Sequence, residues 1–232
     1  MKRVGVIVAM REEYELARAV LACREERLVR GMRFVEGSAD GVELVLVQCG
    51  IGKVCSAIGA VEMIRGYAPE IIINTGVAGG IDPSSRVMDV VVGDEVVYHD
   101  VWCGEGNAWG QVQGLPPRFR SDRGLYRLAL SIVPATGRVR GGLICSGDRF
   151  ITGREELDEI RGRFPGGLAV DMESGSLAQT CHLYGVPFLS YRLISDTPGV
   201  EEHAQQFRDF WTEAPARSFE MLRALIRGAA NQ

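Results

Sequence analysis

The sequence predicts an α/β fold, a single-domain three-layer α/β/α sandwich with a central mixed or mostly parallel sheet. Its length of 232 residues suits one α/β domain with a sizeable core. Its apolar runs are continuous rather than alternating, which is typical of strands that are buried on both faces. Segments with helical periodicity separate these runs, and such alternation favours this architecture. No repeat, low-complexity tract or linker-like stretch divides residues 1–232, so we expect one domain.

The predicted strands are apolar runs rich in β-branched residues. In chain order they are Val4–Val8, Leu44–Val47, Ile71–Ile73, Val90–Val97, Gly142–Cys145 and Phe188–Ile194. The predicted helices show apolar residues at helical spacing. Their markers are Val54, Ala57, Ile58, Val61 and Ile64, then Leu177, Cys181 and Tyr184, and finally Phe207, Phe210, Trp211 and Ala214. Ligands of such sheets bind at the carboxyl ends of the strands, so the residues that follow the strands are the candidates for function.

The composition and charge exclude several classes of protein. The formal net charge is -4, whereas nucleic-acid-binding proteins usually carry a basic stripe. No apolar stretch approaches the ~20 residues of a membrane span, and the charged cluster Arg11–Glu13 follows the N-terminal apolar run too closely for a secretory signal. The six cysteines form no C-x-x-C pair, so we expect reduced thiols and no zinc site. We expect a cytoplasmic protein without metal or organic cofactor, and without a nucleic-acid or membrane partner.

The first candidate segment, Val8–Glu13, lies where a strand turns into a helix. Glu12 and Glu13 in a first helical turn suit the positive end of the helix dipole. A carboxylate at a strand end could equally take a proton from water. Since adjacent acids point in different directions on a helix, only one of the two can do so.

Two glycine-rich segments follow predicted strands. Cys49–Val54 matches neither a P-loop nor a dinucleotide fingerprint, because Val47 and Cys55 stand where those motifs need glycine. What remains is a tight turn where the backbone can approach a small ligand. Asn74–Gly80 holds three glycines in five residues, so a ribose or an aromatic ring could lie against its main chain. A plain strand-to-loop turn would use the same residues.

The segment Ser146–Ile151 also follows a predicted strand, and Val170–Ser176 begins at a strand end. An aromatic and an aliphatic residue in the first could sandwich a planar base, although Phe150 could also belong to the core. In the second, Asp171 and Glu173 are alternate residues at the end of a strand. The small residues after them leave room for a ligand against a helix N-terminus. Glu173 could also merely complement the helix dipole.

The last candidate segment, Tyr191–Asp196, is a strand that ends in Ser-Asp. Arg192 lies within an apolar run and therefore needs an acidic or hydrogen-bonding partner. Asp196 at the carboxyl end of this strand could cap the next turn or act as an acid.

In this order the segments resemble the nucleosidase members of the nucleoside phosphorylase superfamily, above all the bacterial 5′-methylthioadenosine/S-adenosylhomocysteine nucleosidases. The resemblance extends from Gly5 to about Trp211. Its motifs are Ala9–Glu13, Gly50–Lys53, Asn74–Gly80, Tyr98–Asp100, Ser146–Asp148 with Phe150 and Ile151, Asp171–Glu173 and Arg192–Asp196. It implies a nucleoside phosphorylase-like fold and an enzyme that hydrolyses the N-glycosidic bond of 5′-substituted adenosines and releases adenine.

The resemblance also implies a role for each charged residue. Breaking this bond creates a cation-like ribose and a poor anionic leaving group, so the reaction needs carboxyl groups on both sides of the sugar. Asp196, helped by Ser195, would protonate N7 of the purine. Glu13 would deprotonate the attacking water. Glu173, with Arg192 nearby, would hold the ribose 2′-hydroxyl and stabilise the positive charge.

The substrate-binding residues that the resemblance implies surround these acids. Phe150 would stack on adenine, main chain at Ile151 would recognise its edge, and Met172 would pack under the sugar. The remaining binding residues are Val77, Ala78 and Gly79 in the glycine-rich segment, and Met10, Ile51 and Phe207 around the 5′ substituent.

The sequence departs from the family pattern at several positions. Val77 replaces a common serine, which removes a possible contact to sugar or water. Met88 replaces the glycine of a Val-Gly-Asp turn. Asp171 replaces a common glutamate, and we expect its side chain to point away from the site with little effect on it.

The segment Val101–Pro116 departs most from the family. It holds Trp102 and Trp109 among glycines, beside Cys103, where no periodicity would bury them within one subunit. Aromatic residues placed in this way often mark an interface, and in the family this loop crosses a homodimer interface and completes the partner's 5′ pocket. We therefore expect a homodimer. The preferred nucleoside stays open among methylthioadenosine, S-adenosylhomocysteine, 5′-deoxyadenosine and an aminofutalosine-like nucleoside.

Three other functions stay open on the same scaffold. A purine or uridine phosphorylase would carry phosphate-binding arginines near the N-terminal strand, where this chain has Met10–Glu13, and a carboxylate there repels phosphate. A futalosine-type nucleoside hydrolase would share the hydrolytic residues. A non-catalytic nucleoside-binding module would fit the scaffold because fold does not fix function, but the acids at positions 13, 173 and 196 favour an enzyme.

Overall fold

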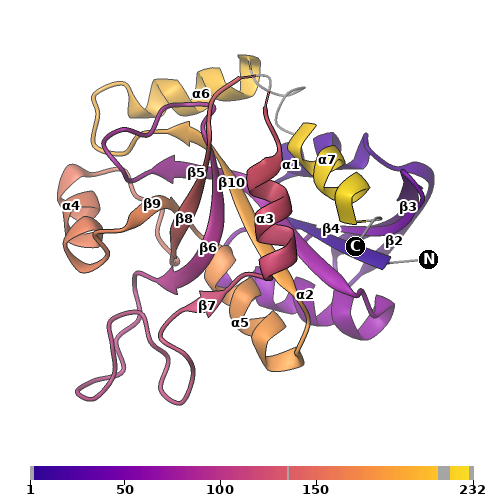
Figure 1. The fold of residues 1–232 in the computed structure, drawn as a ribbon, viewed down its shortest axis with the longest axis horizontal. Coiled ribbons are helices and arrows are strands. Elements are labelled where there is room, and N and C mark those ends of the chain that lie inside the picture. Colours follow the sequence, from indigo (N-terminus) through magenta and orange to yellow (C-terminus); the bar gives the residue numbers. More distant parts are fainter. Residues whose placement is uncertain (1–2, 135, 214–219, 230–232) are drawn as a thin grey trace.

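The computed structural model describes residues 3–134, 136–213 and 220–229. Within them a ten-stranded mixed sheet runs through the centre of the molecule, and helices cover it (Figure 1). The strands are β1 (Arg3–Val8), β2 (Ala22–Val29), β3 (Met32–Ala39), β4 (Val42–Gln48), β5 (Ile71–Gly80), β6 (Val90–Tyr98), β7 (Phe119–Arg120), β8 (Val139–Ser146), β9 (Gly167–Asp171) and β10 (Phe188–Asp196). The predicted α/β fold with a central mixed sheet is confirmed.

The strand order is β10-β6-β8-β9-β5-β1-β4-β3-β2, with β7 against β6. Strand β1 lies parallel between β4 and β5, and β3 pairs antiparallel with both β2 and β4. Strand β10 pairs in parallel with β5 as well as antiparallel with β6, so the part of the sheet from β10 to β5 closes on itself. Because β5 and β10 are parallel neighbours, their carboxyl ends lie side by side, with Asp196 opposite Gly79.

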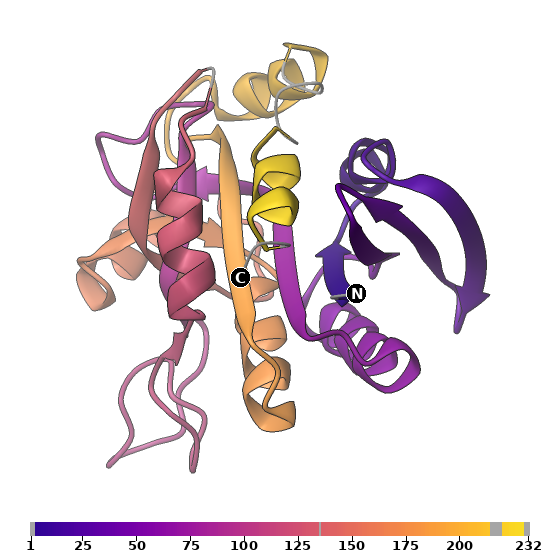
Figure 2. The same cartoon turned by 45° about the vertical axis from the view of Figure 1, so that its right-hand side comes forward.

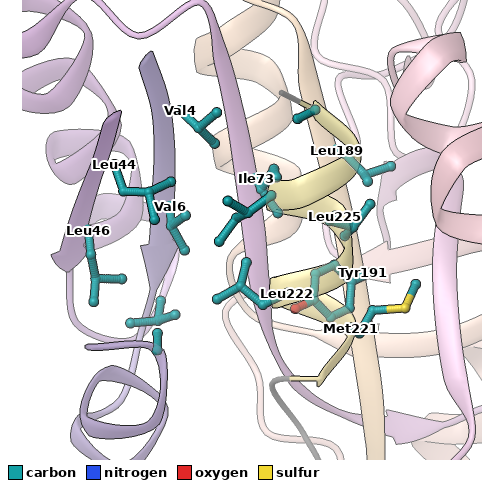
Figure 3. Close-up of a cluster of buried hydrophobic side chains, with 14 of the residues drawn as sticks. Val4, Val6, Leu44, Leu46, Ile73, Leu189, Tyr191, Met221, Leu222 and Leu225 are labelled. Carbon is teal, nitrogen blue, oxygen red and sulfur yellow. The ribbon is translucent and has the colours of Figure 1, made fainter. Parts of the chain in front are cut away.

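The helices lie on both faces of the sheet (Figures 1 and 2). They are α1 (Arg11–Arg18), α2 (Lys53–Tyr67), α3 (Arg123–Ser131), α4 (Arg154–Arg163), α5 (Ser174–Tyr184), α6 (His203–Glu213) and α7 (Glu220–Ala229). Helices α1, α3 and α7 contribute to one buried apolar cluster, and α2 and α5 contribute to another. Figure 3 shows Leu222 and Leu225 of α7 facing Ile73 of β5 and Tyr191 of β10. Each fully buried leucine stabilises the fold by roughly 1.5–3 kcal/mol.

The sequence predicted the most apolar strands and three of the helices, and it missed other elements, among them the core-forming α3 and α7. The predicted strands lie within β1, β4, β5, β6, β8 and β10, and the predicted helices lie within α2, α5 and α6; Ala214 lies outside the described residues. Strand β2 was missed because four charged residues, Arg24–Arg27, interrupt its apolar pattern, as suits a strand at the edge of a sheet. Strand β9 was not among the predicted apolar runs, although Asp171 and Glu173 were expected at a strand end.

Two further observations concern the described part of the chain. None of the helices in it has the length and apolar character needed to span a membrane, and the cytoplasmic location stays a prediction. Cysteines 49, 55, 103, 145 and 181 are free thiols, while the Cys23 side chain lies outside the described part. Those same described residues hold no group of three or more His, Cys, Asp or Glu side chains placed to bind a metal.

Candidate active site

A cavity of about 460 Å3 lies where β1, β5, β9 and β10 end. The residues that line it are Ala9, Met10, Glu13, Ile51, Val77, Ala78, Gly79, Arg149, Phe150, Ile151, Val170, Asp171, Met172, Glu173, Ser195, Asp196 and Phe207. Every residue that the sequence singled out for binding or catalysis is among them except Arg192, which is fully buried behind the wall. The volume and the mainly apolar lining suit a small organic ligand.

Glu13 is the third residue of α1 and brings a buried carboxylate to the cavity. Its Oε2 accepts hydrogen bonds from the backbone N–H groups of Ala9 and Met10, each at 3.0 Å, and its Oε1 accepts one from Val77 at 3.0 Å. Burial raises the pKa of Glu13, against the opposing effects of Arg192 and these N–H groups. The neighbouring Glu12 is exposed. Glu13 therefore completes the start of α1 and also faces the cavity.

Gly76 in β5 allows Glu13 and Arg192 to approach each other. A Cβ atom at this position would clash with Nη1 of Arg192 and with Oε1 of Glu13. Only glycine leaves room here for an arginine from β10 and a glutamate from α1. The glycine-rich segment thus serves the arrangement of the charged groups as well as the wall of the cavity.

Arg192 finds the buried partners that its place in an apolar strand requires. Its Nε lies 2.6 Å from Oδ2 of Asp171, and its Nη2 donates to Oδ1 of Asn74 at 2.6 Å. Its Nη2 also lies 3.6 Å from Oε2 of Glu173. The Asp171 side chain is 1 % exposed and faces away from the cavity, as expected, but it does contact a residue of the site. Its carboxylate is turned toward Arg192, because a buried guanidinium requires a charged partner.

Glu173 immediately precedes α5, and its two carboxylate oxygens have different partners. Its Oε1 accepts a hydrogen bond of 3.0 Å from the backbone N–H of Gly52. Burial raises the pKa of Glu173 to about 7, with Arg192 opposing this shift and Asp171 adding to it. Gly52 has a φ of 91°, which glycine adopts without strain. The glycine turn before α2 therefore approaches a carboxylate of the site.

Motif residues that follow β6 and β8 hold this glycine turn in place. The backbone N–H of Lys53 donates to Oδ1 of Asp148 at 2.7 Å, and its Nζ forms an ion pair with Asp100 at 2.8 Å. The backbone N–H of Asp148 in turn donates to Oδ2 of Asp100 at 2.8 Å. These bonds hold the start of α2 beside the loop that carries Phe150.

Asp196 ends β10 and is 2 % exposed. Its Oδ1 accepts a hydrogen bond of 2.5 Å from Oγ of Ser195, and its Oδ2 lies 2.7 Å from Nε2 of His203. His203 was not predicted from the sequence, since a single histidine seven residues after the acid belongs to no motif. Ala9, Arg149 and Val170 were not predicted in the lining of the cavity either.

Aromatic side chains flank the mouth of the cavity. Phe150 is 55 % exposed, so it does not belong to the core, and its ring lies 5.8 Å from that of Phe207 in an edge-on arrangement. Ile151 beside it is buried. An exposed ring over a cavity is a suitable platform for a planar base.

The loop from residue 101 to residue 116 extends away from the sheet, at the lower left of Figure 1. Its two tryptophans, Trp102 and Trp109, stack with ring centroids 4.7 Å apart, and the guanidinium of Arg163 lies 3.7 Å from the Trp109 ring centroid. Even so, Trp102 is 48 % exposed and Trp109 is 41 % exposed. The stack is therefore a large apolar surface that the subunit does not cover by itself.

Comparison with known proteins decides the family. Residues 3–227 match the model of the phosphorylase superfamily. A 5′-methylthioadenosine/S-adenosylhomocysteine nucleosidase from Actinobacillus succinogenes is 39% identical over 97% of this chain and 98% of that protein. The chain belongs to this nucleosidase family. Nucleosidases cleave N-glycosidic bonds by hydrolysis, so the protein is an enzyme of that class.

Solved structures of the nucleosidase family share the whole fold. The nucleosidase from Neisseria meningitidis, in complex with methylthio-immucillin-A, aligns with a TM-score of 0.91 at 38% identity and covers 98% of this chain and 99% of its own. The nucleosidase from Colwellia psychrerythraea, in complex with adenine, aligns with a TM-score of 0.93 at 32% identity and covers 98% and 95%. The family relationship therefore extends over the cavity and every element around it.

Proposed function

We propose that this nucleosidase hydrolyses the N-glycosidic bond of 5′-methylthioadenosine and S-adenosylhomocysteine and releases adenine. One observation carries the proposal: Glu13, Glu173 and Asp196 reach one cavity from three different elements, and Arg192 lies behind it. Cleavage of a purine nucleoside needs an acid at the base, a stabiliser of positive charge at the sugar, and a base for water. The names of the similar enzymes support the substrates.

Asp196 acts in this proposal as the general acid. It gives its proton to N7 of the purine while the bonding electrons of the C1′–N9 bond pass to the base. Phe150 stacks on adenine and main chain at Ile151 meets its edge. The hydroxyl of Ser195, 2.5 Å from Oδ1, supports the carboxyl group. A buried acid with hydrogen-bond partners can hold its proton in a defined direction.

Glu13 activates the water that attacks C1′ of the sugar. Its three backbone hydrogen bonds fix the carboxylate, and its raised pKa makes it a stronger base than an exposed glutamate. The water adds its oxygen to C1′, and Glu13 accepts the proton. Val77, Ala78 and Gly79 form the adjoining wall of the cavity.

Glu173 binds the ribose hydroxyls and balances the positive charge that develops on the sugar. Arg192 and Asp171 fix it from behind, and Met172 packs under the ring. Met10, Ile51 and Phe207 surround the 5′ substituent, where an alkylthio group would meet mainly apolar side chains.

The same electrostatics disfavour a phosphorylase. Phosphate would need cationic partners on the attacking side of the sugar, where this chain places the Glu13 carboxylate. The only arginine that lines the cavity in the described residues is Arg149, which pairs with Glu156. Membership of an enzyme family also speaks against a non-catalytic binding module.

The exposed tryptophan stack supports a second part of the proposal, a homodimer. Residues 101–116 would pack on a second copy of the chain and complete its 5′ pocket. Burial of two large aromatic rings would contribute several kcal/mol to association. In this proposal each cavity binds a small-molecule nucleoside, and residues 101–116 of each subunit contact the second subunit.

Incubation with 5′-methylthioadenosine tests the proposal directly. We expect adenine and methylthioribose at the same rate with and without phosphate. Formation of a sugar 1-phosphate that depends on phosphate would identify a phosphorylase. Base release from futalosine, with none from methylthioadenosine or S-adenosylhomocysteine, would identify a futalosine-type hydrolase.

A further inference from the structure

His203 is a buried histidine whose only described polar side-chain contact is the acid of the site. It is the first residue of α6 and is 6 % exposed. Its Nε2 lies 2.7 Å from Oδ2 of Asp196, well within hydrogen-bond distance. With Ser195 on Oδ1, both oxygens of the carboxyl group have a partner. The plane of this group is therefore defined from two sides.

The imidazole ring is itself fixed by its surroundings. Its centroid lies 5.7 Å from that of Phe150, with the planes tilted by 41°. The backbone N–H of His203 donates to the carbonyl oxygen of Val200 at 3.2 Å, which ties the start of α6 to the preceding turn. The histidine thus lies between the base platform and the acid, and it can transmit a fixed orientation to the carboxyl group.

We propose that His203 is a positioning residue for Asp196, an inference that rests on the proposed function. Nε2–H donates to Oδ2 both before and after the reaction. During the reaction the O–H bond of Asp196 breaks, the N–H bond at purine N7 forms, and Asp196 is left as a buried carboxylate. His203 keeps its own proton throughout. Its hydrogen bond is stronger to the carboxylate product than to the neutral acid, so it favours proton transfer.

This arrangement predicts an effect on kcat and little effect on KM. His203 is absent from the cavity lining, so its replacement removes no side chain that lines the binding surface. His203→Met removes the donor while keeping an unbranched side chain of similar length. We expect kcat for 5′-methylthioadenosine to fall about ten-fold or more, the usual effect of losing a hydrogen bond to a charged group. His203→Gln places an amide N–H at a similar distance from the backbone, so its kcat should stay close to that of the wild type.

The experiment compares both variants with the wild type and repeats His203→Met in an Asp196→Asn background. Positioning through Asp196 predicts no further loss of kcat in that background. Equal kcat for wild type and His203→Met would overturn the inference, as would a change in KM alone. If His203→Met melts below the assay temperature, His203→Asn replaces it, since its amide is too short to reach Asp196. A wild type that releases no base from any nucleoside would refute the proposed function itself, whereas an active wild type with unaffected variants would refute only the role of His203.

Discussion

The three carboxyl groups that face the cavity differ in what holds them. Glu13 accepts three backbone N–H groups, Glu173 has one N–H group and Arg192, and Asp196 has a hydroxyl and an imidazole. Burial raises the pKa of Glu13 and of Glu173. Different surroundings let similar groups take different parts in one reaction. Each can be tested by a substitution that keeps its shape.

The assignment of the acid predicts the effect of Asp196→Asn. The amide keeps the size of the side chain but cannot give a proton to the departing purine. We expect kcat to fall by at least ~10², the usual contribution of general acid catalysis, while the melting temperature changes little. The check is the rate of adenine release together with a melting curve. Near-normal release would refute the assignment.

The role of Glu13 predicts a contrast between two neighbouring glutamates. Glu13→Gln should remove most turnover because the amide cannot accept a proton from water. Binding of a non-hydrolysable substrate analogue, measured by calorimetry, should persist. Glu12→Gln is the matched control and should leave turnover unchanged, since Glu12 is exposed. A sensitive Glu12 with an insensitive Glu13 would contradict the proposed role.

The raised pKa of Glu173 predicts how stability depends on pH. An ordinary glutamate has a pKa near 4.5, and here it is about 7. The folded state therefore favours the protonated form, so this contribution is fully present below about pH 4.5 and is lost as the pH rises through about 7. Melting temperatures of the wild type and Glu173→Gln should diverge in favour of the variant between pH 5 and pH 8. A constant difference across this range would contradict the burial argument.

Among the elements, the loop of residues 101–116 is the least covered by its own subunit. Trp102→Ala and Trp109→Ala should weaken dimerisation and raise KM for methylthioadenosine. Adenosine, which lacks the apolar 5′ group, should be less affected. Sedimentation at micromolar concentration provides the measurement. Leu28→Ala, at another exposed apolar side chain, is the control and should change neither property. A fully active monomer that is insensitive to both tryptophan changes would refute the proposal that this loop completes the 5′ pocket of a second subunit.

For the whole molecule, the sequence predicted the buried strands well because continuous apolar runs mark them directly. The strand ends indicated where the cavity would lie, and the resemblance to the nucleosidases indicated which residues would line it. The sequence did not predict the side-chain contacts. Asp171 turns toward Arg192 and His203 reaches Asp196 only because of tertiary packing. Neither contact leaves a local pattern in the chain.

The pairing of β5 with β10 has a consequence for the order in which the chain can become active. During synthesis β5 emerges from the ribosome long before β10. Until β10 is made, the edge of β5 that pairs with it stays unpaired. Unpaired strand edges favour aggregation. Closing the sheet requires contact between strands that are distant in sequence, which slows folding. Since Arg192 and Asp196 belong to β10, a nascent chain lacks its proposed general acid until this last strand docks. Folding and the onset of catalysis should therefore coincide.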